Sequence, residues 1–181
     1  MKYDQRILTK AGREIRVRNG EAADGEAVLE NFILTHTQTD YLLTYPDECS
    51  LTPEQEGRYL EKKAESPREV ELIALVDGRV AGTAGIDAVG TCCKLRHRAE
   101  FGVALLKEYW GLGIGRILLE ACIQCARDAG YTQLELSVVA DNARAVSLYQ
   151  SAGFVELGRN PKGFYSRTAG FQKVIFMGLV L

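Results

Sequence analysis

Three glycines at alternate positions, Gly111, Gly113 and Gly115, lead directly into a helical pattern. Apolar residues then recur at the spacing of one helix face and predict a helix over 113–129, ended by Gly130. Glycine is costly to order, so three of them before a helix indicate close approach of backbone N–H groups to a ligand. A helix start attracts anions. With Arg116 on the first turn, the pattern predicts a phosphate or pyrophosphate site, a plain strand-to-helix turn being the alternative.

Two common phosphate loops do not fit these glycines. A Walker A loop needs Gly-Lys-Ser/Thr after its first glycine and four further residues, and the sequence contains no such run. The dinucleotide fingerprint needs its third glycine one residue later and directly follows a strand, whereas residues 107–110 intervene here. Glu135 lies at the expected distance for that fingerprint, but the alternation places it in the middle of a strand.

The remaining pattern predicts a single α+β domain over residues 1–181 with a mixed central sheet. The hairpin signal is Asp77-Gly78 between two apolar runs. Pro53 opens the second helix, and Asn142 caps a short helix whose inner face holds Ala145 and Tyr149. The predicted order is strand 14–20, helices 21–35 and 53–66, two hairpin strands within 70–89, strand 95–106, helix 113–129, strand 133–140, the short helix, and strands from 154 and over 173–181.

Composition excludes several classes of protein. The net charge of −2 leaves no basic excess for nucleic acid, so no nucleic-acid partner is expected. We expect no membrane contact either, because no apolar run is long enough to span a bilayer and the start does not resemble a signal peptide.

Five cysteines, an odd number, favour a reducing, cytoplasmic location. Cys122 and Cys125 form a CxxC inside a helix, which predicts core packing rather than zinc or redox chemistry. Cys92 and Cys93 are interpreted in the same way. We therefore expect no metal site.

Two motifs resemble those of the GNAT superfamily of N-acetyltransferases. The residues from Trp110 to Gly115 match Gln/Arg-x-x-Gly-x-Gly/Ala except at Trp110, and "NARAVSLYQSAGF", starting at Asn142, matches N-x-x-A-x-x-L-Y-x-x-x-G-F at every fixed position. The resemblance implies a single-domain fold whose mostly antiparallel mixed sheet is flanked by helices, with splayed strands forming an acyl-CoA cleft. It implies acetyl-CoA as co-substrate. Because Trp110 replaces a side chain that could bind phosphate, we expect a lower affinity for acetyl-CoA than the family pattern suggests.

The resemblance also implies which residues contact acetyl-CoA. The backbone at the end of one strand would pair with the pantetheine arm, and the glycine loop would hold the pyrophosphate. Asn142 could bond the pantetheine amides, although capping its helix is an equally natural role. The implied binding residues are Val103, Ala104, Leu105, Gly111, Leu112, Gly113, Ile114, Gly115, Arg116, Asn142, Ala145 and Tyr149.

Two residues are candidates for proton transfer. Tyr149 could protonate the departing thiolate as general acid, or it could be a core tyrosine. Glu100 shares a strand face with Gly102 and Ala104, and partial burial there would raise its pKa and suit it to act as the base for an ammonium acceptor. The alternatives are an exposed strand carboxylate and deprotonation through water.

The acceptor is indicated only by two loops. The helix-to-helix connection carries Asp40, Tyr41, Tyr45, Asp47 and Glu48, which either line a mouth that favours a cationic amine or form a solvated loop. A segment over 158–173 resembles a family loop that closes over the acceptor or packs in a homodimer. We expect acetyl transfer to the primary amine of a small molecule by direct attack. The alternatives are a protein N-terminal or lysine acetyltransferase and a non-catalytic acyl-CoA sensor.

Overall fold

The computed structural model describes residues 1–8 and 12–181, and within them eight strands form one continuous sheet. The spatial order is β1-β2-β3-β4-β5-β6-β8-β7, with β5 and β6 parallel and every other neighbouring pair antiparallel. The predicted mixed, mostly antiparallel α+β sheet is therefore confirmed. The strands are β1 (Asp4–Leu8), β2 (Glu14–Asn19), β3 (Val70–Val76), β4 (Arg79–Ala88), β5 (Arg98–Leu105), β6 (Gln133–Val139), β7 (Val155–Ser166) and β8 (Gly170–Val180).

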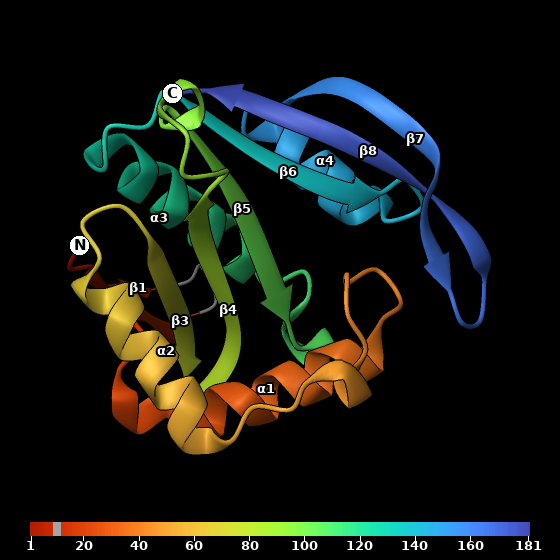
Figure 1. The fold of residues 1–181 in the computed structure, drawn as a ribbon. Helices are drawn as coiled ribbons and strands as arrows, with labels where there is room; N and C mark the ends of the chain where they lie inside the picture. Colours follow the sequence, from red (N-terminus) through yellow and green to blue (C-terminus); the bar gives the residue numbers. More distant parts are fainter. Residues whose placement is uncertain (9–11) are drawn as a thin grey trace.

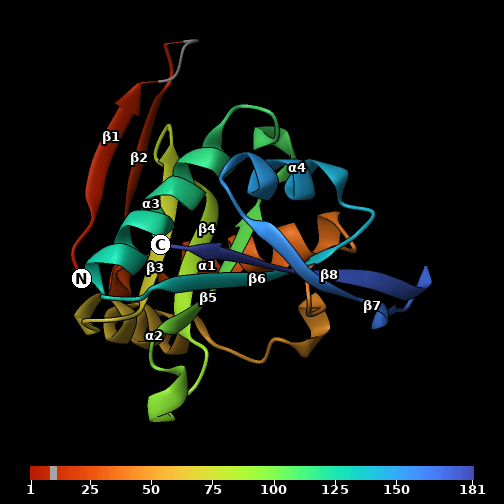
Figure 2. The same ribbon diagram turned by 90° about the horizontal axis from the view of Figure 1, so that it is seen from above.

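Helices cover both faces of the sheet (Figures 1 and 2). On one face lie α1 (Gly25–Gln38) and α2 (Pro53–Glu65), and on the other lie α3 (Ile114–Asp128) and α4 (Ala143–Ser151). Short 3-10 turns occupy η1 (Ala22–Asp24), η2 (Pro46–Glu48), η3 (Cys93–Leu95) and η4 (Lys107–Tyr109). None of the helices in the described part of the chain is both long and apolar enough to cross a bilayer.

Each face of the sheet has its own apolar core. The larger core lies beneath α3 and α4 and includes Leu118, Cys122, Leu134 and Phe101. The smaller one joins α1 and α2 to the sheet through Val28, Leu60, Ile73 and Val80. Alternate residues of a strand point to opposite faces, so β3 and β4 contribute to both cores.

Local sequence signals account for the turns and helix ends. Asp77 and Gly78 both have positive φ, 52° and 80°, which is the primed turn that matches the twist of a two-residue hairpin. At the start of α2, Thr52 and Gln55 form a reciprocal capping box ahead of Pro53 in the first turn. Both elements lie where the sequence predicts them.

Four sequence predictions need correction. The segment over 158–173, expected as a loop, lies mostly in β7 and β8, which pair as one long hairpin. The strand β1 was not expected, because its five residues are a charged, exposed edge with no apolar alternation. The first helix begins with the turn η1 and continues to Gln38 rather than ending near Thr35. Cys92 and Cys93 are exposed in the β4–β5 connection, so their predicted packing is wrong. Cys122 and Cys125 are buried, as predicted.

Candidate functional site

The site begins where β5 and β6 separate (Figure 1). The two strands pair only from Arg98 opposite Gln133 to Glu100 opposite Glu135. Beyond this point β5 stays paired with β4 as far as Leu105, while β6 stays paired with β8. The facing edges of β5 and β6 are therefore unpaired along the rest of their length, and an extended ligand could bond to them.

A cleft of about 710 Å³ occupies this opening. Its lining includes β5 from Glu100 to Leu105, the glycine loop, the first turns of α3 and α4, and the loop after α1. Most of the residues predicted from the sequence meet here: Glu100, Val103, Ala104, Leu105, Gly111, Gly113, Gly115, Arg116, Asn142, Ala145 and Tyr149. The side chains of Leu112 and Ile114 do not contribute. Leu112 is exposed, and Ile114 is buried in the core, so only its backbone could meet a ligand.

The glycine loop has the backbone that the sequence suggested. Gly111 and Gly113 have φ of 80° and 84°, a region that other residues avoid, and Gly113 is the N-cap of α3. Gly115 lies within the first turn, where a Cβ would stand 3.6 Å from the Leu148 side chain of α4. Two of the glycines thus set the loop conformation, whereas the packing of α3 on α4 does not require the third, since 3.6 Å is an ordinary contact distance. The helix start and its N–H groups line the cleft.

Arg144 is a cleft residue that the sequence reasoning missed. Its guanidinium lies over the Trp110 ring, 5.3 Å from the centroid, and it lines the cleft beside the glycine loop. The Trp110 indole N–H in turn donates to the Leu105 carbonyl at 2.7 Å, which fixes the ring against the end of β5. The residue that replaces Gln or Arg in the loop motif therefore holds an arginine from α4. The sequence did contain a signal for this residue, because Arg144 lies inside the second motif.

Arg116 brings a second positive charge to this end of the cleft. One of its terminal nitrogens donates to the Ser151 hydroxyl at 2.5 Å, and the other lies 3.6 Å from Glu120. Both arginines stand within the first turn of their helices, where the helix dipoles add to their charge. This end of the cleft is built to attract an anion.

Tyr149 lines the cleft from α4 and is almost fully buried, with 7% of its surface exposed. Its ring packs edge-on against Phe101, with centroids 6.2 Å apart, and also contacts Phe154. Burial raises the pKa of its phenol to about 12, so the hydroxyl is protonated throughout the neutral range. Tyr149 therefore packs in the core and lines the cleft with a protonated hydroxyl.

Asn142 has its capping role in the structure. Its side-chain oxygen accepts a hydrogen bond from the backbone N–H of Ala145 at 3.2 Å. The residue also lines the cleft, and its side-chain amide NH₂ remains as a donor. Capping and contact with a ligand are therefore compatible.

Glu100 lies on the face of β5 that points away from α3 and α4, because its neighbours Ala99 and Phe101 are in the larger core. It is exposed and lines the cleft. The partial burial expected from the sequence is absent. A position at the point where the strands separate leaves it open to an incoming acceptor.

The loop after α1 contributes less than expected to the acceptor end. Tyr41 lines the cleft with Leu42 and Leu43, but Asp40, Tyr45, Asp47 and Glu48 do not. Those four residues attach the loop to the β7–β8 hairpin instead. Asp40 accepts from the Ser166 hydroxyl, and Asp47 accepts from Arg167 at 2.7 Å while that guanidinium lies over the Tyr45 ring.

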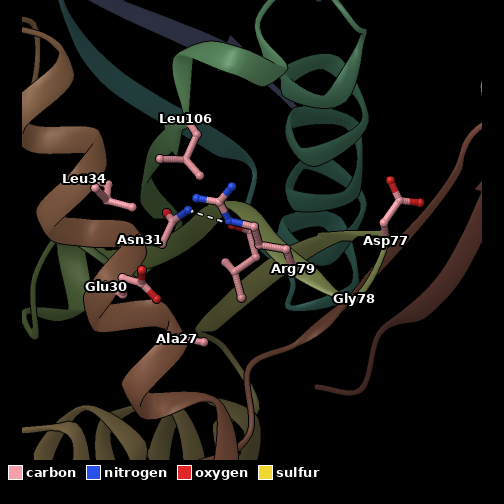
Figure 3. A pocket seen from close by; sticks show the side chains of 9 residues that line it. Ala27, Glu30, Asn31, Leu34, Asp77, Gly78, Arg79 and Leu106 are labelled. Carbon is pink, nitrogen blue, oxygen red and sulfur yellow. Dashed lines mark hydrogen bonds between the residues drawn. The ribbon is translucent and has the colours of Figure 1, made fainter.

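A second cavity of about 340 Å³ lies between α1 and the β3–β4 hairpin (Figure 3). Asn31 donates to the Val80 carbonyl at 3.0 Å, and Arg79 extends across the cavity toward it. Arg79 also pairs with Glu108 at 2.8 Å, and both side chains are more than half exposed.

Among the described residues, no group of three His, Cys, Asp or Glu side chains is arranged to hold a metal ion.

Comparison with known proteins relates this architecture to one family. The chain matches the family model of the GNAT acetyltransferases over residues 33–154, a range that contains both motifs. An acetyltransferase of that family from Streptococcus pneumoniae has the same fold, with a TM-score of 0.88 and 31% identity over 92% of this chain and 99% of that one.

Two curated relatives differ in the acceptors that their names state. The L-amino acid N-acetyltransferase AaaT of Escherichia coli (strain K12) is 27% identical over 92% of this chain and 98% of its own length. The ribosomal protein bS18 alanine N-acetyltransferase of the same strain is 40% identical over 81 residues, 44% of this chain and 53% of that enzyme. One relative thus acts on amino acids and the other on a protein.

Proposed function

The chain belongs to the GNAT family of acetyltransferases, and on this premise we propose that its cleft transfers the acetyl group of acetyl-CoA to the primary amine of a small molecule. The protein is an acyltransferase enzyme, and acetyl-CoA is its acetyl donor. The observation that carries this proposal is the separation of β5 from β6 beyond Glu100. The cleft that opens there is lined both by Glu100 of β5 and by Tyr149 of α4.

The residues of the cleft fit acetyl-CoA along its length. Gly111 and Gly113 form the turn that leads into α3 and line the cleft, where the helix start offers free N–H groups, and Arg116 and Arg144 add positive charge for the phosphates. The unpaired edge of β5 around Val103 offers backbone groups to the amides of the pantetheine arm. Asn142 keeps a donor for the same arm.

The proposed chemistry divides between the two faces of β5. Acetyl-CoA supplies a thioester whose carbonyl carbon accepts the amine. Glu100, directly or through water, removes the proton that the acceptor ammonium must lose before its nitrogen can attack. A backbone N–H at the open edge of β5 polarises the carbonyl oxygen. The Tyr149 hydroxyl gives its proton to the sulfur as the carbon–sulfur bond breaks.

A small acceptor is favoured by the way the mouth of the cleft is held. Asp40 joins the loop after α1 to the β7–β8 hairpin, and Tyr41 and Phe164 from these two segments both line the cleft. A mouth bounded on both sides suits a compact molecule better than a folded protein. The second candidate, a protein N-terminal acetyltransferase, is supported by the bS18 relative.

The test is acetyl transfer followed by mass spectrometry across amino acids, polyamines, aminoglycosides and short peptides. We expect an acetylated small amine, with peptides poorer by at least about tenfold in kcat/KM, equivalent to about 1.4 kcal/mol of transition-state stabilisation. A preference for peptides would contradict the small-molecule proposal.

Tyr149→Phe separates catalysis from mere binding of the donor. Because a general acid contributes about 10²–10⁴-fold, this variant should lose that much kcat and keep its affinity for acetyl-CoA. Tyr165→Phe, an exposed tyrosine on β7, is the matched control. If wild type binds acetyl-CoA and yields no product with any amine of the panel, either its acceptor lies outside the panel or the chain is a sensor.

We also propose a cytoplasmic location and a homodimer. All five cysteines are free, which is consistent with a reducing compartment.

Exposed apolar side chains on β7 and β8, among them Leu157 and Phe171, are consistent with contact between two copies. Sedimentation equilibrium would measure the oligomeric state.

A further inference from the structure

The two faces of the cleft carry opposite charge. Arg116 and Arg144 come from α3 and α4, which cover one face of the sheet. Glu100 points to the other face, and Asp87 of β4 lies directly opposite it in the β4–β5 register. Cross-strand partners share a face, so both carboxylates face the acceptor side, and both line the cleft.

Asp87 forms an ion pair with a buried lysine. The Lys63 ammonium, with 5% of its side chain exposed, bonds to Asp87 and also lies 3.3 Å from Glu69. Asp87 itself keeps 55% of its side chain exposed. Lys63 therefore orients the carboxylate without removing it from the cleft.

The acceptor side is negative even with this lysine counted. Lys63 is paired with two carboxyl groups, those of Glu69 and Asp87, and Glu100 lies beside Asp87 on the next strand, so three carboxylates accompany one ammonium here. The other residues lining this side are uncharged, namely Thr39, Tyr41, Leu42, Leu43 and Phe164. Within the described lining, Arg116 and Arg144 are the basic residues, and both belong to the opposite face.

This distribution of charge separates classes of amine. An α-amino acid carries its carboxylate one carbon away from the reacting nitrogen. That group would stand close to Glu100 and Asp87 with no lysine, arginine or histidine of the described lining to pair with it, and like charges placed together are costly. A second ammonium group would instead meet Asp87.

We propose that the acceptor is a small amine with two or more positive charges and no carboxylate beside the reacting nitrogen, such as an aliphatic polyamine, and that Asp87 binds its second charge. This inference rests on the proposed function, and it names the acceptor class of that same site. Glu100 faces the reacting nitrogen, and Asp87, one strand away, faces the distal ammonium.

The first test uses wild-type enzyme and matched acceptors. L-Alanine and L-alaninamide differ in the charge beside the amine and also in the pKa of that amine, so their rates are compared per concentration of unprotonated amine. On that basis we expect the amide to have a kcat/KM at least about tenfold higher. Spermidine should exceed both. Equal rates for alanine and alaninamide, or a higher kcat/KM for free amino acids or a short peptide than for spermidine, would overturn the inference and leave acetyl transfer intact.

The second test is Asp87→Asn, with Asp128→Asn on the exposed end of α3 as control. The Asp87 variant should raise the KM for spermidine about tenfold, as loss of one charge pair implies, with alaninamide much less affected. A melting curve checks that Lys63, still paired with Glu69, keeps the fold intact. An unchanged KM for spermidine in a folded variant argues against the role of Asp87. Absence of any acetylated amine in wild type would instead refute the proposed function.

Discussion

Single side chains in this protein gain their roles from neighbours that are distant in sequence. Trp110 departs from the loop motif, yet it holds Arg144 over its ring and bonds to the end of β5. The departure therefore does not leave the pyrophosphate end without a cation. We therefore propose that Arg144 offsets the lower affinity for acetyl-CoA expected from Trp110 alone.

Arg144→Ala should weaken binding of acetyl-CoA. A hydrogen bond to a charged group contributes about 1.5–3 kcal/mol, so we expect Kd to rise at least about tenfold. Isothermal titration calorimetry would measure this. Arg127→Ala, at the far end of α3, is the control, and Arg144→Lys should retain part of the affinity. An unaltered Kd in Arg144→Ala would show that the guanidinium does not meet the phosphates.

Glu71 makes stability depend on pH. Burial raises the pKa of its carboxyl to about 7, and the charges of Asp87 and Glu56 act in the same direction. A hydrogen bond with Thr83 and the charge of Lys63 lower this pKa but do not outweigh burial. Between about pH 4.5 and 7 the unfolded chain loses this proton and the folded chain keeps it. The contribution of Glu71 to the free energy of unfolding therefore falls as pH rises through this window.

Glu71→Gln removes that dependence. Its stability relative to wild type should increase from pH 5 to pH 8, by up to about 3 kcal/mol for a shift of this size. Urea unfolding at each pH measures the difference, and Glu65→Gln, exposed at the end of α2, serves as control. A difference that stays constant with pH would contradict the prediction.

At the scale of elements, the parting of β5 from β6 defines the site. Arg98 bonds to Glu135 across the last paired residues, its Nε donating to one carboxylate oxygen and its Nη2 to the other at 2.6 Å. The pair is more than two-thirds buried on both sides. The strands are thus joined at one end by a charge pair and open at the other. The position of that junction sets how far the cleft extends.

A double-mutant cycle of Arg98→Ala and Glu135→Ala should measure a coupling of about 1 kcal/mol, the upper range for pairs near the surface. The bond to Arg98 lowers the pKa of Glu135, so this stabilisation is present above the ordinary carboxyl value and lost as pH falls. Urea unfolding at pH 7 and pH 3.5 would detect both effects. Additive single effects at pH 7 would rule out the coupling.

For the whole molecule, binding of the donor depends on parts that come from separate elements of the fold. The α3 and α4 starts, the open edge of β5 and the glycine loop all line it. A ligand that contacts all of them stabilises the folded state by mass action.

Acetyl-CoA at about 100 times its Kd should add about 2.7 kcal/mol and raise the melting temperature by about 5–10 °C in a chain of this size. Differential scanning fluorimetry or calorimetry would record the shift. Acetylpantetheine, which lacks the pyrophosphate, should give a smaller shift at the same concentration because it does not reach the arginines. Equal shifts would mean that the glycine loop does not bind phosphate.

The sequence by itself determined the features that depend on near neighbours along the chain. The φ values of Gly111 and Gly113, the cap at Asn142, the turn at Asp77-Gly78 and the family motifs all follow from local steric and hydrogen-bonding rules. These sufficed to predict the α+β sheet and most residues of the cleft.

The tertiary structure alone decided which distant side chains meet. The β4–β5 register places Asp87 beside Glu100, and the packing of α4 places Arg144 over Trp110. Asp40 bonds to Ser166 at the end of β7 and does not line the cleft. The exposure of Glu100 and the edge strand β1 also depend on long-range pairing. No local propensity encodes such contacts, because their free energy comes from burial and pairing between segments far apart in the chain.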